Sequence, residues 1–271
     1  MKKLNMKKFN YYSPKSLDEC SKLFKTCEFP QYIAGGMTLL PSIKQGLSSP
    51  TDLIDLTNIN KIRDITSNDK LITIGCLATH NEVAHSKLIK KKIPGLAYLA
   101  SKIADNAVRN KGTIGGSICN ADPAADYPSS LLSLDANIHT NLREINARNF
   151  FVDMFETSLE DGEIVTNVSI PEPEFSSYEK FSSQASKYAI VGVFLSVSDR
   201  KASIAITGAS NKVFLLEELE NKTIDELRKF NLDDINFNKY DINSDINASI
   251  DYRISLIKSL VTKSINNFIY E

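Results

Sequence analysis

The chain has 271 residues, of which 42% are hydrophobic and 24% charged, and its 32 basic residues nearly balance 33 acidic ones. These values are typical of a globular protein of up to two domains, and they exclude a disordered or fibrous chain. The net charge is −1 and the one basic run, KLIKKK at 87–92, is short. We therefore expect no nucleic-acid partner.

Hydropathy and cysteine usage limit the location of the protein. The N-terminus is basic but lacks a signal-peptide apolar region, and the most apolar run, AIVGVFLSV at 189–197, is too short to span a bilayer and predicts a buried strand. The cysteines show no CxxC spacing, which argues against a zinc or iron–sulfur site held by this chain alone. We expect a cytoplasmic protein with no membrane contact and no metal. Its cysteines are Cys20, Cys27, Cys76 and Cys119.

The first 57 residues have the pattern of a small α/β unit. Ser16 and Glu19 form a capping box, and Gly46 stops a later helical stretch. Strand, glycine turn, helix and strand then follow in order. We expect a helix at 17–26, a strand at 31–34, the glycine turn, helical turns at 38–45 and a strand at 51–57.

A second α/β segment is expected to follow. Thr79 and Glu82 form another capping box, which opens helical segments broken at Pro94 and Gly95. Pro171 ends the last strand and indicates an edge strand. In chain order we expect a strand at 71–79, helical segments to about 107, a short helix at 129–134, strands and turns at 137–150 and the edge strand at 163–173.

A proline- and serine-containing linker predicts a domain boundary near 175. We assign domains to 1–174 and 175–271. In the second domain, two β-rich runs joined by SDRK predict a hairpin at 191–210, and a charged helix is expected at 217–230. An Asn/Asp-rich loop separates it from an amphipathic helix at 251–270. The residues expected to face inward from this helix are Leu256, Ile257, Leu260, Val261, Ile265, Phe268 and Ile269.

Two glycine pairs stand out, in YIAGGMTLL at 32–40 and in GTIGGSICNADPAAD at 112–126. Backbone without side chains can approach a phosphate, and successive N–H groups in a turn or at a helix start bind anions. Two such loops suggest the diphosphate of a dinucleotide cofactor. Neither fits G-x-G-x-x-G or the P-loop pattern, and on spacing alone tight turns remain the alternative.

Longer motifs around these glycines resemble a known family. AGGMTLLPSIKQG and TIGGSICNADPAADYPSSLLSLDA resemble the two flavin loops of the FAD-binding subunits of the xanthine dehydrogenase and carbon monoxide dehydrogenase family of molybdenum hydroxylases. EIVTNVSIP, YEKFSSQAS and ASIDYRISLIKSLVTKSI resemble later segments of that family, in the same order. The resemblance implies an α+β chain, in which a PCMH-type FAD-binding domain of two α/β lobes precedes a C-terminal α+β domain with an antiparallel sheet and helices.

The resemblance also implies a set of cofactor contacts. The first loop should wrap the diphosphate and the second should contact diphosphate and flavin. Asp126 should bond the adenosine side of FAD, and Lys180 should reach the flavin from the second domain. On the residues alone, Asp126 is equally a helix cap, Lys180 a surface lysine, and Ile103 and Val165 core residues. The implied contacts are Tyr32, Ile33, Ala34, Gly35, Gly36, Met37, Thr38, Leu39, Ile103, Thr113, Ile114, Gly115, Gly116, Ser117, Asn120, Asp126, Val165 and Lys180.

Several positions depart from the family pattern. Met37 and Thr38 stand where the family has Thr and Asp, Ser117 replaces an Asn, and Gln184 replaces an Arg. These differences put individual contacts in doubt. His80, His85 and His139 are interpreted as structural residues, and Cys119 as a small residue beside the site.

The family role is electron transfer within a complex. It implies non-covalent FAD on this chain, which passes electrons from [2Fe–2S] clusters on a small subunit to NAD⁺ or another acceptor, while a large subunit carries the molybdenum cofactor. The chain itself lacks cluster motifs and is too short for a molybdenum domain. We expect a xanthine-dehydrogenase-like enzyme that is inactive on substrate without its partners. The alternatives are a stand-alone flavin oxidoreductase and a flavin-free assembly subunit.

Overall fold

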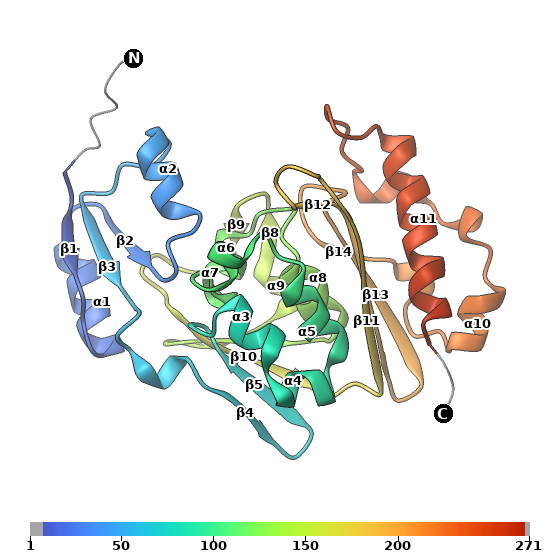
Figure 1. Ribbon diagram of the computed structural model, residues 1–271, viewed down its shortest axis with the longest axis horizontal. Coiled ribbons are helices and arrows are strands. Elements are labelled where there is room, and N and C mark those ends of the chain that lie inside the picture. Colours follow the sequence, from blue (N-terminus) through green and yellow to red (C-terminus); the bar gives the residue numbers. More distant parts are fainter. Residues whose placement is uncertain (1–7, 269–271) are drawn as a thin grey trace.

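The computed structural model of the protein describes residues 8–268, which form three lobes in a row (Figure 1). A small N-terminal lobe lies at one end, a larger middle lobe at the centre, and a sheet with the last helix at the other end. The arrangement agrees with the expected class of two α/β lobes followed by an α+β domain with an antiparallel sheet.

The N-terminal lobe has a three-stranded parallel sheet in the order β1-β3-β2. Its first helix begins where predicted, because Ser16 Oγ accepts the N–H of Glu19. Its second helix ends at Gly46, which takes a left-handed conformation with φ of +74°. The elements are β1 (Asn10–Tyr12), α1 (Leu17–Thr26), β2 (Pro30–Ile33), α2 (Leu39–Gln45) and β3 (Asp52–Asp55).

The middle lobe is built on an antiparallel sheet in the order β4-β5-β10-β6-β7. Strand β10 is at the centre of this sheet, so its prediction as an edge strand was wrong. Pro171 lies at the very end of β10, opposite Leu71, where the loss of one N–H leaves the rest of the ladder intact. The strands are β4 (Ile65–Asn68), β5 (Leu71–Gly75), β6 (Asn137–Thr140), β7 (Glu144–Asn146) and β10 (Val165–Pro171), beside the small hairpin β8 (Phe151–Asp153) and β9 (Glu156–Thr157).

Short helices cover the middle lobe. The predicted capping box of Thr79 and Glu82 is present in full. The predicted break before Pro94 is present, because one helix ends at Lys92 and Pro94 begins the next, where a proline lacks only an N–H that would have no helical partner. Gly95 lies inside that helix, so the predicted break there was wrong. The helices are the 3₁₀ turn Asn60–Ile62, α3 (His80–His85), α4 (Lys87–Lys92), α5 (Pro94–Ser101), α6 (Asn106–Arg109), α7 (Ile114–Asn120), α8 (Tyr127–Ser133) and α9 (Ala147–Phe150).

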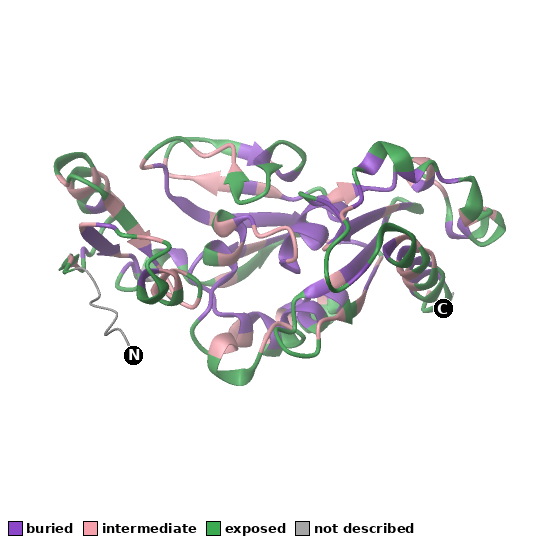
Figure 2. Ribbon diagram, turned by 90° about the horizontal axis from the view of Figure 1, so that it is seen from above, coloured by how far each residue is buried: buried purple, intermediate pink, exposed green. Residues whose placement is uncertain are grey.

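The last lobe is an antiparallel sheet in the order β11-β12-β13-β14. Helices α5 and α8 contact one side of it and α11 packs against β11 and β12. Because β12 lies between these layers, nearly all of its residues are buried, as the run AIVGVFLSV predicted (Figure 2). The strands are β11 (Phe175–Ser182), β12 (Ala189–Ser198), β13 (Lys201–Thr207) and β14 (Phe214–Leu215).

The C-terminal helices differ in part from expectation. The single helix expected at 217–230 is instead a 3₁₀ turn, a break and a short helix, because Thr223 starts a new capping box with Glu226. Ile257, Val261 and Ile265 are buried on the last helix as predicted, whereas Ile269 lies outside the described residues. The elements are 3₁₀ turns at Glu217–Leu219, Leu232–Asp234 and Phe237–Tyr240, α10 (Ile224–Lys229) and α11 (Ile250–Asn266).

Candidate functional site

The first glycine pair lies in the turn between β2 and α2. Gly36 has a φ of +69°, which side chains disfavour. A Cβ atom on Gly35 would lie 1.9 Å from the carbonyl oxygen of Lys111. Both glycines are therefore required by the chain itself, one for its backbone conformation and the other for close approach to the segment before α7.

This turn also leaves a row of backbone donors open. The N–H groups of Gly35, Gly36, Met37 and Thr38 donate to no acceptor among residues 8–268. These residues are half-buried or exposed, so their N–H groups are accessible to a ligand, and several N–H groups in succession form an anion-binding concavity. The turn therefore fits a diphosphate.

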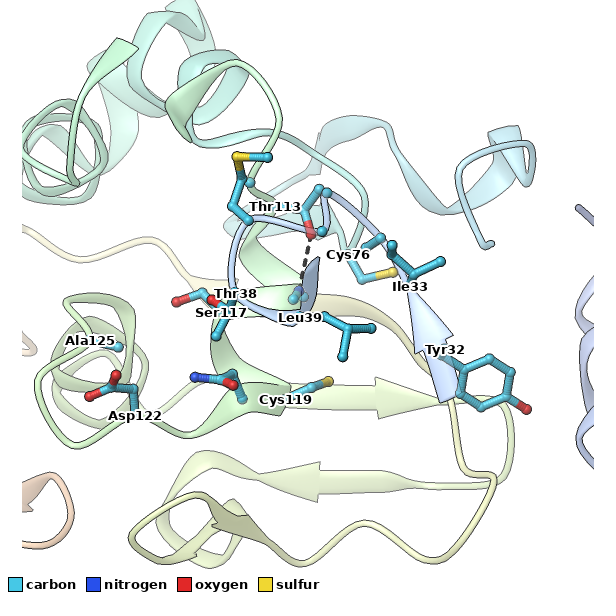
Figure 3. Close-up of a pocket in the computed structure, with 18 of the residues that line it drawn as sticks. Tyr32, Ile33, Thr38, Leu39, Cys76, Thr113, Ser117, Cys119, Asp122 and Ala125 are labelled. Carbon is cyan, nitrogen blue, oxygen red and sulfur yellow. Dashed lines mark hydrogen bonds between the residues drawn. The ribbon is translucent and has the colours of Figure 1, made fainter. Parts of the chain in front are cut away.

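The second glycine pair lies in a helix, not in the loop we expected. Thr113 Oγ1 caps α7 by accepting the N–H of Gly116 at 3.0 Å (Figure 3). The N–H groups of Ile114, Gly115 and Ser117 donate to the carbonyls of Ala78, Cys76 and Thr113. The interpretation that both pairs offer free backbone donors was wrong for the second pair, because capping by Thr113 and the carbonyls of the segment between β5 and α3 use them.

The two glycines of α7 face different surroundings. A Cβ atom on Gly115 would lie 2.5 Å from Cys76 Cβ, so this glycine allows α7 to pack on the strand end. A Cβ atom on Gly116 would meet only Thr113 Oγ1 at 3.1 Å and Ala34 Cβ at 3.9 Å. Gly116 thus exposes bare backbone opposite the first turn, which is where a ligand can approach both.

A cleft of about 620 Å³ runs past both glycine pairs and receives residues from all three lobes. This volume is within the range of cofactor sites. Most of the expected contacts line it, but Ile114 is fully buried in the core and Lys180 is not part of the lining. The expected residues that line it are Tyr32, Ile33, Ala34, Gly35, Gly36, Met37, Thr38, Leu39, Ile103, Thr113, Gly115, Gly116, Ser117, Asn120, Asp126 and Val165.

Sequence reasoning missed further lining residues on two segments. Leu159, Glu163 and Ile164 precede the expected contact Val165, and Tyr188 follows the motif YEKFSSQAS. Glu163 and Ile164 open the motif EIVTNVSIP itself, and Leu159 and Tyr188 lie within a few residues of the two motifs, so reading the whole of each motif and its flanks is the signal that would have found them. Further lining residues include Gln31, Ser48, His80, Cys119, Asp122, Ser186 and Lys187.

Asp126 and Lys180 form a buried pair at the cleft wall. Lys180 Nζ lies 2.8 Å from Asp126 Oδ1, their side chains are 6% and 5% exposed, and the hydroxyl of Tyr178 donates to the same carboxylate. Burial raises the pKa of Asp126 despite the lysine. Asp126 makes no capping bond to α8, which contradicts the capping alternative, and Lys180 is a buried residue, not a surface one.

Two further titratable groups of the cleft, His80 and Cys119, are held uncharged. Burial, with a contribution from Arg109, lowers the pKa of His80 to about 4, and its Nδ1 lies 3.3 Å from Tyr127 Oη. The thiol of Cys119 is open to the cleft, but desolvation by the surrounding protein raises its pKa to about 12. Both groups are therefore neutral at pH 7.

Metal clusters and membrane-spanning helices are both absent from the described part of the chain. No group of three or more His, Cys, Asp or Glu side chains within residues 8–268 is placed to hold a metal ion. Over the same residues, every helix is too short or too polar to cross a membrane.

Known proteins are similar to this chain in sequence and in fold. Residues 7–173 match the family described as FAD binding domain in molybdopterin dehydrogenase. The glyceraldehyde dehydrogenase medium chain of Sulfolobus acidocaldarius is 30% identical, over 94% of this chain and 96% of that one. The nicotine 6-hydroxylase medium subunit of Paenarthrobacter nicotinovorans is also 30% identical, over 94% and 95%. The reconstituted CO dehydrogenase from Oligotropha carboxidovorans has a TM-score of 0.87 at 28% identity, covering 96% of this chain and 97% of that one.

Proposed function

We propose that this chain, which belongs to the family of FAD-binding domains in molybdopterin dehydrogenases, is the medium subunit of a three-subunit molybdenum hydroxylase. It would receive electrons from [2Fe–2S] clusters on a small subunit and pass them to NAD⁺ or another acceptor. A large subunit with the molybdenum cofactor would oxidise the substrate. We place the complex in the cytoplasm, in keeping with four free cysteines.

The open row of N–H groups at Gly35 to Thr38 is the observation that carries this proposal. These donors would bind the diphosphate of FAD, while the bare backbone of Gly116 lets that group lie against α7. Ile103 and Val165 would pack against the cofactor from the cleft wall. When bound, FAD supplies exchange of electrons singly or in pairs.

The finer proposal is that the complex is xanthine-dehydrogenase-like. It rests on the motif resemblance, and the names of the relatives define the substrates against which it is tested. The purified complex should be assayed with xanthine, glyceraldehyde and nicotine. Preference for xanthine supports the finer proposal, and preference for either other substrate overturns it while leaving the role of this subunit intact.

FAD binding is tested by reconstitution. The purified chain mixed with FAD and desalted should retain a visible flavin spectrum at about one flavin per chain, as a single pyrophosphate site requires. Gly116→Leu is the matched control, because its side chain enters the cleft and contacts little protein. This variant should stay folded and colourless. A folded wild-type chain that remains colourless would favour the flavin-free subunit instead.

The stand-alone enzyme is separated from the subunit by turnover. The chain alone should not oxidise any of the three substrates, whereas the complex should. Steady turnover by the isolated chain would overturn the subunit role. The low pKa of His80 makes its imidazole a weak base, the raised pKa of Cys119 keeps its thiol protonated, and Lys180 pairs with Asp126, so these cleft groups are poorly suited to proton abstraction.

A further inference from the structure

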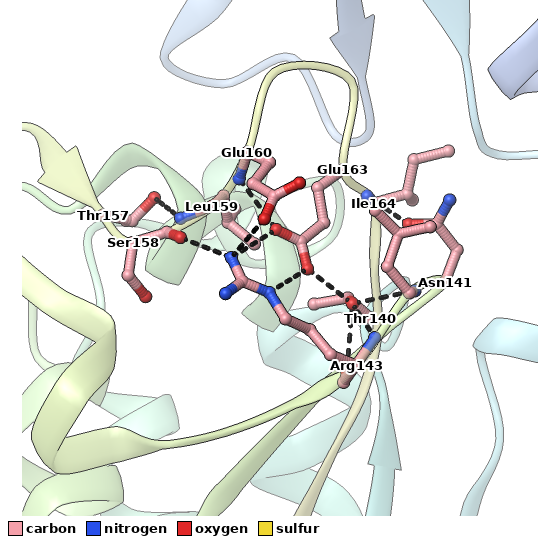
Figure 4. Close-up of polar contacts among 10 residues, drawn as sticks. Thr140, Asn141, Arg143, Thr157, Ser158, Leu159, Glu160, Glu163 and Ile164 are labelled. Atoms are coloured by element: carbon pink, nitrogen blue, oxygen red, sulfur yellow. Dashed lines mark hydrogen bonds and ion pairs between the residues drawn. The ribbon is translucent and has the colours of Figure 1, made fainter.

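A segment without regular structure forms one wall of the cleft. It runs from Ser158 to Ile164, between β9 and β10, and is here called the latch (Figure 4). Leu159, Glu163 and Ile164 of the latch line the cleft. The latch therefore has one side toward the ligand, and its position must be fixed by contacts on the other side.

Glu163 is the centre of those contacts. Its carboxylate accepts from Arg143 at 2.9 and 3.0 Å, from Thr140 Oγ1 at 2.7 Å and from the N–H of Glu160 at 2.7 Å. Its side chain is 0% exposed, so only its backbone reaches the cleft. Hydrogen bonding to Arg143 lowers its pKa to about 2, which keeps the carboxylate charged.

Three further hydrogen bonds fix both ends of the latch to the middle lobe. Arg143 donates to the carbonyl of Ser158 at 2.7 Å, where the latch begins. Asn141 exchanges two bonds with Ile164, where the latch ends: its Oδ1 accepts the N–H at 2.8 Å and its own N–H donates to the carbonyl at 2.9 Å. Residues 140–143 thus hold both ends of the latch in place.

The tip of the latch contacts the N-terminal lobe. The hydroxyl of Tyr32 donates to the carbonyl of Gly162 at 3.2 Å, and Phe24 stacks on Tyr32 with ring centroids 4.9 Å apart. Gly162 has a φ of +78°, and a Cβ atom there would lie 2.8 Å from Phe24. Tyr32 comes two residues before the turn that carries the open N–H groups. The latch therefore joins the middle lobe to the strand that leads into that turn.

We propose that the latch couples the two lobes across the cleft and that Glu163 is its positioning residue. The side chain of Glu163 does not reach the cleft. It fixes Leu159 and Ile164 as cleft wall and presents the Gly162 carbonyl to Tyr32, which positions the strand that leads into the first glycine turn. The identity of the ligand rests on the proposed function, whereas the coupling of the lobes does not.

The first experiment needs no ligand. Hydrogen exchange is measured by mass spectrometry on the ligand-free full chain and on the Glu163→Gln and Arg143→Met variants. The amides of Glu160 and Ile164 should exchange about tenfold faster in both variants, because their acceptors are released or loosened. Arg143 is 41% exposed, so Arg143→Met tests the latch even where Glu163→Gln fails to fold.

Arg148→Met is the matched control. Arg148 is 43% exposed and bonds Glu220 and Asp135, neither of which lines the cleft. The amide hydrogens of the latch should exchange at the same rate in this control as in the wild type. Unchanged exchange in Arg143→Met, or the same acceleration in Arg148→Met, would overturn the latch.

The second experiment measures binding of FAD to the full chain. Arg143→Met and Tyr32→Phe should each raise the dissociation constant about tenfold, equivalent to about 1.4 kcal/mol. The double variant should lose little more than either single variant, because both substitutions break one chain of contacts. Fully additive losses would overturn the coupling. A wild-type chain that binds no FAD would instead refute the proposed function, and the exchange experiment would still decide the latch.

Discussion

The two glycine pairs line one cleft as close neighbours, but their backbones are used differently. The turn at Gly35 and Gly36 leaves its N–H groups open, whereas α7 at Gly115 and Gly116 uses all of its own. At three of these positions the fold itself requires glycine, because of close packing or a positive φ, and Gly116 alone faces open space. A bare backbone therefore indicates a ligand only after close packing and backbone conformation have been excluded.

The largest effect is expected from Gly35→Ala. Its Cβ would lie 1.9 Å from a backbone oxygen that cannot move alone, so the free energy of unfolding should fall by more than about 4 kcal/mol. Urea denaturation measures it. Gly46→Ala is the control for close packing, because Gly46 has no neighbour within 4 Å; its positive φ, which Gly35 lacks, should cost only about 1–2 kcal/mol. Equal losses in the two variants would refute close packing as the reason for Gly35.

The second largest effect is a pH dependence of the free energy of unfolding. It comes from His80, which packs against Gly112 just before the second glycine pair. The N–H of His80 donates to the carbonyl of Gly112, and its ring packs against that glycine. Burial lowers its pKa from the ordinary value of 6.5 to about 4 in the folded chain, so between these values only the unfolded chain takes up a proton. Stability should fall by about 3 kcal/mol as pH drops from 6.5 to 4.

His80→Asn should remove this contribution. Urea denaturation between pH 7 and 4 should show a shallower decline for the variant than for the wild type. Parallel declines would mean that His80 takes up its proton normally in the folded chain, and that the buried ring does not hold Gly112 as described.

A smaller effect is expected from Gly115→Ala. Its Cβ would lie 2.5 Å from Cys76 Cβ, and α7 must shift to relieve the contact, at a cost of about 2 kcal/mol. The double variant with Cys76→Gly removes the nearest atom but leaves the Cys76 carbonyl oxygen at 2.7 Å, so it should recover only part of the loss. No recovery would show that the contact with the Cys76 side chain is not what demands a glycine here.

The smallest effect on stability is expected from Gly116→Ala. Its methyl group meets one hydroxyl at 3.1 Å, so the free energy of unfolding should stay within about 0.5 kcal/mol of wild type. Binding of FAD, measured by fluorescence titration, should weaken all the same, because the methyl group enters the ligand's side of the cleft. Unchanged binding would remove Gly116 from the site and with it the contrast between the two pairs.

Local signals predicted local structure well. Caps and stop signals placed α1 at its observed bounds and α2 within one residue, and the apolar run at 189–197 correctly predicted a buried strand. Most of the cleft lining followed from the family motifs. The helical state of 114–120 was missed, because glycines have low helix propensity and only the cap by Thr113 outweighs it.

Contacts between distant segments were the part the sequence did not predict. The central place of β10 depends on pairing with β5 and β6, which no local pattern encodes. The pairing of Asp126 with Lys180 and the contacts of Glu163 join residues whose partners are set by the fold. Burial then moves the pKa of Asp126 up and hydrogen bonding moves that of Glu163 down, although both are carboxylates in one wall.

The core of the middle lobe includes residues from the later part of the sequence, which are synthesised after the rest of that lobe. Tyr178, Phe194 and Leu215 belong to the same hydrophobic cluster as β5 and α5, and the charge of Asp126 is balanced only by Lys180. A nascent chain that has reached residue 174 therefore exposes apolar surface that its own later strands must cover. The N-terminal strands can pair early, but the cleft, whose lining extends to Tyr188, can close only after β11 has been synthesised.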